Sequence, residues 1–256
     1  MSLAAKHLSY AYADTGIIDD VNVEVQAGKI LVVIGPNGAG KSSLLKLLSG
    51  ELKPSAGAIH FEQQPLAAWP RRKLACARAV LRQQESLSFA FTVMEMVLMG
   101  RAPHGTNHVV NKEISMAALT AMDVVHLQER LYTELSGGEK QRVQLARCFA
   151  QIWENKQSRY LLLDEPVSAL DIAHQKILMQ QIKKLSNDGV GIVVALHDLN
   201  LAAQYADEVL LMNKGCVVVK GSPEAVLTAK NIEVVYNTAV CIVSHPELNI
   251  PQVLIC

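Results

Sequence analysis

A glycine-rich segment of eight residues is the part of this chain best suited to chemistry. Residues 35–42 match the pattern G-x-x-x-x-G-K-[ST] and read Gly35, Pro36, Asn37, Gly38, Ala39, Gly40, Lys41 and Ser42. Glycines let backbone N–H groups close around phosphate oxygens, a lysine reaches the β- and γ-phosphates, and a serine hydroxyl can ligate Mg²⁺. An apolar run precedes the segment and a helical pattern follows it, as this motif requires. It predicts a phosphate-binding loop.

Two further apolar runs end in side chains that can act on phosphates. Asp164 and Glu165 end YLLLDE, and His197 ends GIVVALH. Ligands of open α/β sheets bind beyond the carboxyl ends of the strands, so we expect these three side chains at one sheet edge. Asp164 would hold Mg²⁺ directly or through water. Glu165 could orient or deprotonate an attacking water, and His197 could hydrogen-bond that water or the γ-phosphate.

A glutamine pair and a second helix start complete the candidate residues. Gln83 or Gln84, after the predicted strand in VLRQQ, could place an amide oxygen on Mg²⁺ or water, although glutamines at loop starts are ordinary. In LSGGEK (135–140), Ser136 and Glu139 have the spacing of a capping box. Helix starts with free N–H groups bind anions, so this chain has a second potential phosphate cradle.

The elements that must position these residues form an α/β pattern. Alternating residues predict a half-buried strand over 21–25, and a continuous apolar run predicts a buried strand over 30–35. Further strands are predicted at 58–62, 160–165, 191–196, 208–212 and 216–220. From about residue 85 to 157 the apolar spacing is helical and predicts no strand. The pattern therefore predicts an α/β core interrupted by a helical segment.

Composition limits the class of protein. The chain has 256 residues, half of them apolar, with 24 basic and 24 acidic side chains. This balance argues against a nucleic-acid-binding face, which would be basic. Five scattered cysteines, without a Cys-x-x-Cys pair, suggest neither a disulfide framework nor a zinc site. No apolar run approaches the roughly 18 residues that span a bilayer, so we expect any membrane span to come from another chain.

The order of these motifs resembles an ATP-binding-cassette (ABC) ATPase along the whole chain. LSGGE, a phosphate-binding loop and a downstream DEP-x-x-x-LD form a highly specific combination. The resemblance implies an α/β P-loop NTPase core with a mixed sheet, an N-terminal antiparallel β subdomain and an inserted helical subdomain. It implies a single ABC domain over 1–256, with the core at 1–84 and 158–256 and the helical subdomain at about 85–157.

The family resemblance also implies roles for individual residues. ABC ATPases meet head to tail as dimers and use ATP and Mg²⁺, so Ser136, Gly137, Gly138 and Asp171 would contact the nucleotide of a second copy. Tyr12 would stack on adenine, although Tyr10 lies on the same strand face. Ser43 would join the eight loop residues around the phosphates. Glu165, His197 and Gln83 would be catalytic, and Ser42, Gln83 and Asp164 would hold Mg²⁺.

A stretch within the predicted helical segment indicates which kind of transporter this chain serves. SFAFTVMEMVLMGRAPH (88–104) resembles ABC importers of iron–siderophore complexes, vitamin B12 and haem. Its apolar residues suit contact with a permease helix, namely Phe89, Phe91, Val93, Met94 and Met96. The alternative is that they form the core of the helical subdomain, as some of them must. RAVLRQ (78–83) and IWENKQSRY (152–160) most resemble the haem importers. The resemblance implies a peripheral subunit on the cytoplasmic face of a bacterial inner membrane. It would serve a permease dimer, depend indirectly on a periplasmic binding protein, and contact neither haem nor nucleic acid.

Three alternative functions remain. The same ATPase role could serve a ferric siderophore or vitamin B12. A soluble ABC ATPase acting on nucleic acid or ribosomes commonly has two cassettes or long insertions, and this chain shows neither. A regulatory module that binds ATP without turnover is disfavoured by the presence of Lys41, Glu165 and His197.

Overall fold

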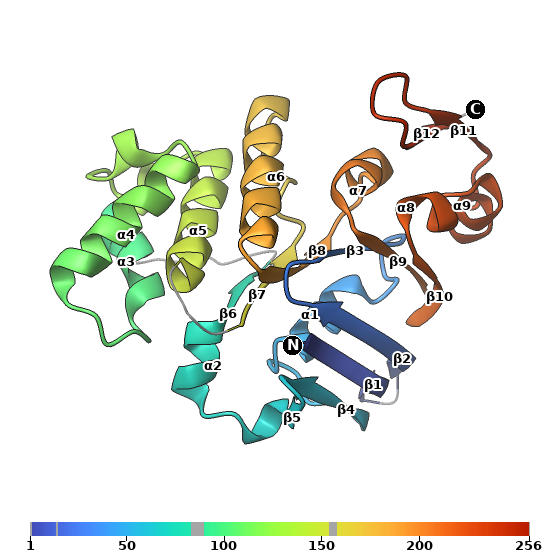
Figure 1. Cartoon of the computed structure of the whole chain (residues 1–256), viewed down its shortest axis with the longest axis horizontal. Coiled ribbons are helices and arrows are strands. Elements are labelled where there is room, and N and C mark those ends of the chain that lie inside the picture. Colours follow the sequence, from blue (N-terminus) through green and yellow to red (C-terminus); the bar gives the residue numbers. More distant parts are fainter. Residues whose placement is uncertain (1, 14, 83–89, 154–157, 256) are drawn as a thin grey trace.

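Two sheets with packed helices and a C-terminal hairpin make up the fold (Figure 1). The computed structural model describes residues 2–13, 15–82, 90–153 and 158–255. The strands are β1 (Ser2–Tyr12), β2 (Thr15–Gln26), β3 (Ile30–Ile34), β4 (Ala56–Phe61), β5 (Gln64–Pro65), β6 (Arg78–Leu81), β7 (Arg159–Asp164), β8 (Val190–Ala195), β9 (Glu208–Asn213), β10 (Cys216–Gly221), β11 (Val240–Ser244) and β12 (Pro251–Ile255). The α-helices are α1 (Lys41–Leu48), α2 (Arg71–Ala77), α3 (Val93–Leu98), α4 (His108–Ala121), α5 (Gly137–Ile152), α6 (Ile172–Asn187), α7 (Leu199–Tyr205), α8 (Pro223–Val226) and α9 (Ala229–Tyr236).

The central sheet is mixed, as predicted. Its order is β10-β9-β3-β8-β7-β6, in which β9, β3, β8, β7 and β6 pair in parallel and β10 pairs antiparallel with β9. The strands β3, β7 and β8 all end at the edge where the phosphate-binding loop, the Asp164–Glu165 pair and His197 follow them in sequence. This edge is where an open α/β sheet binds ligands.

The continuous apolar run of β3 reflects burial on both of its faces. Leu31 and Val33 belong to a core cluster with α1 and the antiparallel sheet. Ile30, Val32 and Ile34 face the other way, into a cluster that includes the apolar sides of α5 and α6. All five side chains are at most 1% exposed. Burying each such side chain contributes about 1.5–3 kcal/mol, so β3 is a firm base for the loop that follows it.

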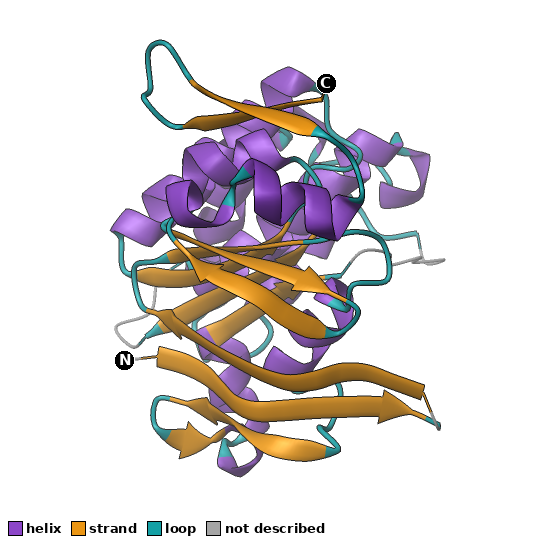
Figure 2. Ribbon diagram, turned by 90° about the vertical axis from the view of Figure 1, so that its right-hand side faces the viewer, coloured by secondary structure: helices purple, strands orange, loops and turns teal. Residues whose placement is uncertain are grey.

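A second, antiparallel sheet lies below the central one in Figure 2, with the order β2-β1-β4-β5. Helix α1 contacts β1 and β2 on one side and β7 and β8 on the other, and therefore lies between the two sheets. The strand predicted at 21–25 is the end of the longer β2. Register shifts in the pairing of β1 with β2 break the alternation that would have marked its first half.

The described residues between β6 and β7 form helices joined by turns and loops, and none of the named strands lies among them. Helices α3, α4 and α5 gather at one end of the molecule (Figure 1), with three 3₁₀ turns, η2 (Met99–Arg101), η3 (Val125–Leu127) and η4 (Tyr132–Glu134). Helix α5 contacts α3 and α4 but also β6 and β7, and one core cluster runs through all of them. The division into a core and a helical subdomain stays a prediction.

Several of the apolar residues that suit contact with a permease helix are core residues, the alternative that the sequence left open. Val93 and Met96 are fully buried, and Met94 is 8% exposed. Phe91 is partly buried against the same core, and Phe89 lies outside the described residues. The helical spacing of Val93 and Met96 therefore marks their packing inside the molecule, and neither side chain can contact a permease without rearrangement.

A C-terminal hairpin, β11–β12, packs on α7. The side chain of Asn200 bonds the backbone of Val253 twice: Oδ1 accepts the Val253 N–H at 2.8 Å and Nδ2 donates to its carbonyl at 3.2 Å. These bonds anchor the hairpin on the helix that follows His197. Among the described residues, no helix is both long and apolar enough to cross a membrane.

Candidate nucleotide-binding site

The phosphate-binding loop joins β3 to α1 and is braced from two sides. Gly40 has a φ of 100° at the N-terminus of α1. A Cβ on Gly40 would lie 2.8 Å from Cδ1 of Ile18 in β2, so both the conformation and the space favour glycine. The turn between β9 and β10 braces the other side, because Gly215 donates its N–H to the carbonyl of Ala39 at 3.0 Å and accepts the N–H of Asp19 at 3.1 Å.

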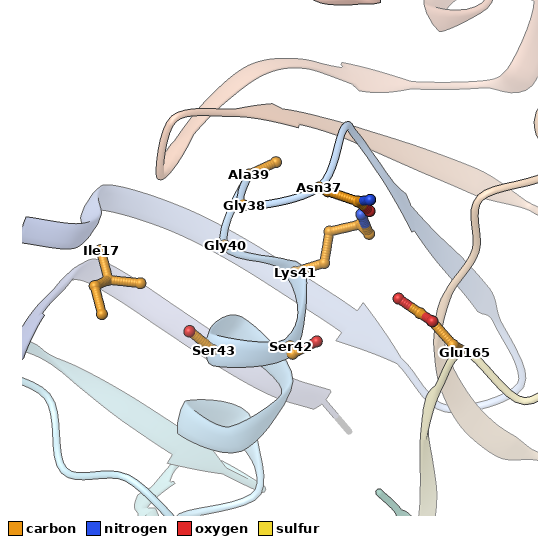
Figure 3. A pocket seen from close by; sticks show the side chains of 9 residues that line it. All are labelled: Ile17, Asn37, Gly38, Ala39, Gly40, Lys41, Ser42, Ser43 and Glu165. Atoms are coloured by element: carbon orange, nitrogen blue, oxygen red, sulfur yellow. The ribbon is translucent and has the colours of Figure 1, made fainter. Parts of the chain in front are cut away.

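The loop forms one wall of a pocket of about 250 Å³. Figure 3 shows the lining side chains, with Lys41 directed toward Asn37 and Glu165 on the opposite side of the pocket. The lining residues are Ile17, Asn37, Gly38, Ala39, Gly40, Lys41, Ser42, Ser43 and Glu165. Among the predicted residues, Gly35 and Pro36 support the loop outside this lining, whereas Ile17 lines the pocket without having been predicted.

Lys41 is buried under the loop and is held by it. Its Nζ donates to the carbonyls of Gly35 at 2.7 Å and Pro36 at 3.1 Å. Burial lowers the pKa of Lys41, while the carboxylates of Glu165 and Asp164 oppose that shift. An ammonium group has three donors, so these two bonds leave one N–H that can be offered to a phosphate oxygen.

Ser42 and Asp164 form a pair of oxygens at the start of α1 and the end of β7. The Ser42 hydroxyl donates to Oδ1 of Asp164 at 3.1 Å. Burial raises the pKa of Asp164, the bond from Ser42 acts against this, and the nearby Glu165 carboxylate adds to the increase. Within the described ranges, no group of three or more His, Cys, Asp or Glu side chains is arranged to hold a metal. Mg²⁺ commonly takes one or two protein oxygens, with phosphates and water as its other ligands, so this pair fits Mg²⁺.

Glu165 and His197 are brought into direct contact. Nε2 of His197 lies 2.6 Å from Oε1 of Glu165. Glu165 has a φ of 49°, a left-handed conformation that is uncommon for this residue type and found at functional sites. Its N–H donates to the carbonyl of Ala195, and its own carbonyl accepts from the hydroxyl of Ser168. The turn therefore holds the Glu165 carboxylate at the pocket, with the His197 imidazole against it.

The predicted capping box at the start of α5 is present. The Ser136 hydroxyl accepts the Glu139 N–H at 3.4 Å, and Oε2 of Glu139 accepts the Ser136 N–H at 2.8 Å. Hydrogen bonds from the Ser136 side chain and backbone lower the pKa of Glu139. Ser136 and Gly137 are exposed, and neither they nor Gly138 line the pocket around the phosphate-binding loop. This helix start is therefore open to another molecule.

Two further predicted residues, Tyr12 and Asp171, lie apart from the pocket lining. Tyr12 ends β1 with its side chain 71% exposed, free of the core and available for stacking. Asp171 caps α6 by accepting the N–H of His174 at 2.9 Å. Gln83 and its alternative Gln84 lie outside the described residues. The contact of Gly215 with the phosphate-binding loop was, like the position of Ile17, not predicted. The local Asn213–Lys214–Gly215 pattern indicates a turn but not which residues the turn contacts.

Comparison with known protein families identifies the family of this chain. Residues 18–168, more than half of the chain, match the family model described as ABC transporter. The chain belongs to the ABC transporter family. Among relatives of this ABC protein, the hemin import ATP-binding protein HmuV of Gloeobacter violaceus is 47% identical over 98% of the chain and 93% of that protein. HmuV of Pseudomonas entomophila is 45% identical, with 93% of each chain covered.

A solved structure agrees with this assignment. The ABC protein superposes on a chain of a transporter assigned to the metal-chelate type, in an inward-facing conformation, with a TM-score of 0.82 and 29% identity. The match covers 100% of this chain and 97% of that one. The α/β P-loop NTPase fold of an ABC ATPase is therefore confirmed.

Proposed function

We propose that this chain is the ATP-hydrolysing subunit of a bacterial ABC importer that moves haem across the inner membrane through a separate permease. The observation that carries the proposal is the 47% identity, along 98% of the chain, to a hemin import ATP-binding protein. ATPase activity is the property common to the family, and the pocket supports it with a buried lysine, a Ser–Asp oxygen pair and a positioned glutamate.

ATP would bind with its phosphates in the loop of residues 35–43. The backbone N–H groups at the start of α1 and the helix dipole favour the negative phosphates. Lys41 would turn its remaining N–H toward the β- and γ-phosphates, and Tyr12 would stack on the adenine. Ser42 and Asp164 would hold Mg²⁺, which when bound neutralises phosphate charge, and Gln83 is a further proposed ligand.

Hydrolysis would depend on Glu165 as the general base. Its carboxylate faces the pocket across from Lys41, so a water beside the γ-phosphate could give it a proton (Figure 3). The imidazole of His197, in contact with this carboxylate, would fix its orientation and could also bond the γ-phosphate. General bases in such positions accelerate reactions by about 10²–10⁴-fold.

A second copy of the chain would complete each site. The exposed start of α5, with Ser136, Gly137 and Gly138, would cover the γ-phosphate bound by the other copy, and Asp171 would contact the same nucleotide across the interface. ATP would then favour the closed dimer because its contacts to the second copy exist only in that state. Closure would drive a permease dimer, and hydrolysis with product release would reopen the pair.

The proposed setting follows from this role. Two copies would sit peripherally on the cytoplasmic face of the inner membrane, each against one permease subunit. A periplasmic binding protein would deliver the substrate from the other side, so haem would not contact this chain.

Uptake into vesicles tests the proposal. Vesicles containing the permease, its binding protein and this ATPase would be offered haem, a ferric siderophore and vitamin B12 in parallel, with a Glu165→Gln assembly as the inactive control. ATP-dependent uptake of haem alone supports the proposal. Uptake of another chelate keeps the mechanism and rejects haem. No uptake, with ATPase activity intact, would argue against an importer.

A further inference from the structure

Four ionisable side chains form a connected series between the start of α6 and the middle of α5. Asp171 lies at the start of α6, His174 one turn later, Asp123 in the turn after α4, and Arg142 on α5. Nδ1 of His174 lies 2.7 Å from Oδ1 of Asp171, and Nε2 of the same ring lies 3.8 Å from Oδ2 of Asp123. Thus one imidazole faces two carboxylates from different parts of the chain.

Asp123 passes this connection to α5. Nη1 of Arg142 donates to the backbone carbonyl of Asp123 at 2.7 Å and lies 3.8 Å from its Oδ2. The two basic side chains are the covered ones, with 10% of Arg142 and 24% of His174 exposed, whereas both carboxylates are mostly exposed. The series alternates in sign when His174 is protonated, and each neighbour is within ion-pair distance.

A second set of contacts joins the same two elements. The Gln141 amide donates to the carbonyl of Pro166 at 3.1 Å. Gly138 approaches the carbonyl of Ala169 so closely that a Cβ there would lie 2.9 Å from the oxygen. The start of α5 and the loop before α6 are therefore packed on each other, and the series from Asp171 to Arg142 gives a second connection between α5 and the start of α6.

We infer that His174 is a positioning residue that couples Asp171 to the LSGGE helix α5 through Asp123 and Arg142. The inference deepens the proposed function, in which Asp171 and Ser136 contact the nucleotide of the second copy. Because both contacts must be made at once when the dimer closes, holding them in a fixed relation lowers the ordering cost of closure. Hydrogen bonds from His174 also lower the pKa of Asp171, which keeps that carboxylate ionised.

A double-mutant cycle tests this coupling. The parent is the full chain carrying Glu165→Gln, and the readout is the ATP concentration that gives half-maximal dimer by analytical ultracentrifugation. His174→Ala and Asp123→Asn should each raise this concentration about 5-fold, and the double variant should raise it no further, because each removes the same connection. Asp123 has a φ of 53°, which asparagine tolerates. Effects that multiply to about 25-fold in the double variant would overturn the coupling.

His174→Asn separates the coupling to Asp123 from the local side-chain bond to Asp171. An asparagine amide nitrogen is as many bonds from Cβ as Nδ1 of histidine, so it can still donate to Asp171 but does not reach Asp123. We expect His174→Asn to match Asp123→Asn. If it instead behaves like the parent, the His174 side chain acts only through its local bond to Asp171 and the inference is wrong. The exposed His126, close to Asp123 in sequence, provides a control, and His126→Ala should match the parent.

Two measurements keep the inference distinct from the proposed function. If the Glu165→Gln parent itself fails to dimerise with ATP, the proposed dimer mechanism fails. If the parent dimerises and the His174 variants dimerise equally well, the coupling alone is rejected. Thermal unfolding of each variant identifies loss of folding, and His174→Asn can retain a side-chain hydrogen bond to Asp171 in case His174→Ala unfolds.

Discussion

At the residue scale, Asp164 combines a proposed Mg²⁺-binding position with a cost in stability. Its carboxylate is 4% exposed, and burial raises its pKa. A raised folded-state pKa means that the folded chain holds a proton at pH values where the unfolded chain has lost it. The stability of the fold therefore decreases as pH rises through this interval, and the full cost remains above the raised pKa.

Replacing Asp164 with asparagine should stabilise the free protein. The amide has no charge to bury, and its oxygen can still accept the Ser42 hydroxyl. We expect Asp164→Asn to raise Tm by roughly 2–4 °C at about pH 7.5, corresponding to about 1 kcal/mol for a chain of this size, while ATPase activity falls. Calorimetry without nucleotide measures this, and the gain should shrink as pH is lowered toward about 4.

The exposed Asp188 at the end of α6 is the matched control. Asp188→Asn removes the same charge at the surface and should change stability by less than about 0.5 kcal/mol. A Tm for Asp164→Asn at or below that of the parent at neutral pH would show that the buried carboxylate has compensating partners, and that the stability cost argued above is wrong.

At the scale of the element, two adjacent glycines at the start of α5 should respond in opposite ways to alanine. A Cβ on Gly138 would meet the carbonyl of Ala169 at 2.9 Å, whereas a Cβ on Gly137 meets nothing within 4 Å. Gly137→Ala should raise the free energy of unfolding by about 0.5 kcal/mol through a less flexible unfolded chain. Gly138→Ala should lower it by about 1 kcal/mol by pushing α5 from the loop. Chemical denaturation compares the pair, and equal effects would contradict this packing.

The sequence predicts those structural features whose patterns involve residues close together in the chain. The cap of α5 needs only Ser136 and Glu139, three residues apart, and was predicted correctly. The first half of β2 was missed because its register shifts against β1 remove the alternating pattern.

At the site, the predicted strand ends indicated that Glu165 and His197 lie at one edge of the sheet. The contact between them depends on the left-handed turn at Glu165, which no spacing rule encodes.

At the scale of the whole molecule, the distribution of the candidate site residues fits the proposed dimer. Lys41 is buried beneath its own loop, while Ser136 and Gly137 are exposed on a helix start that does not line the same pocket. In the proposed dimer, a single copy would therefore present two halves of different sites. The sequence already indicates a second potential phosphate-binding site, at the start of α5. That this helix start lies apart from the phosphate-binding loop is a result of the fold.

Mixed subunits can test whether the sites are shared. In the Glu165→Gln background, one chain would carry Lys41→Ala and a differently tagged chain Ser136→Arg. Head-to-tail pairing gives the mixed dimer one intact site, because the unaltered Ser136 of the first chain meets the unaltered Lys41 of the second.

As a control, both substitutions would be placed in one chain, and that chain would be mixed with the Glu165→Gln chain. Each site of this mixed dimer then has one damaged half. We expect at least about 5-fold more ATP-dependent co-purification in the first mixture, since one complete composite site supplies contacts that no half-damaged site can. Equal co-purification in the two mixtures would mean that each copy binds ATP with its own LSGGE helix or without one.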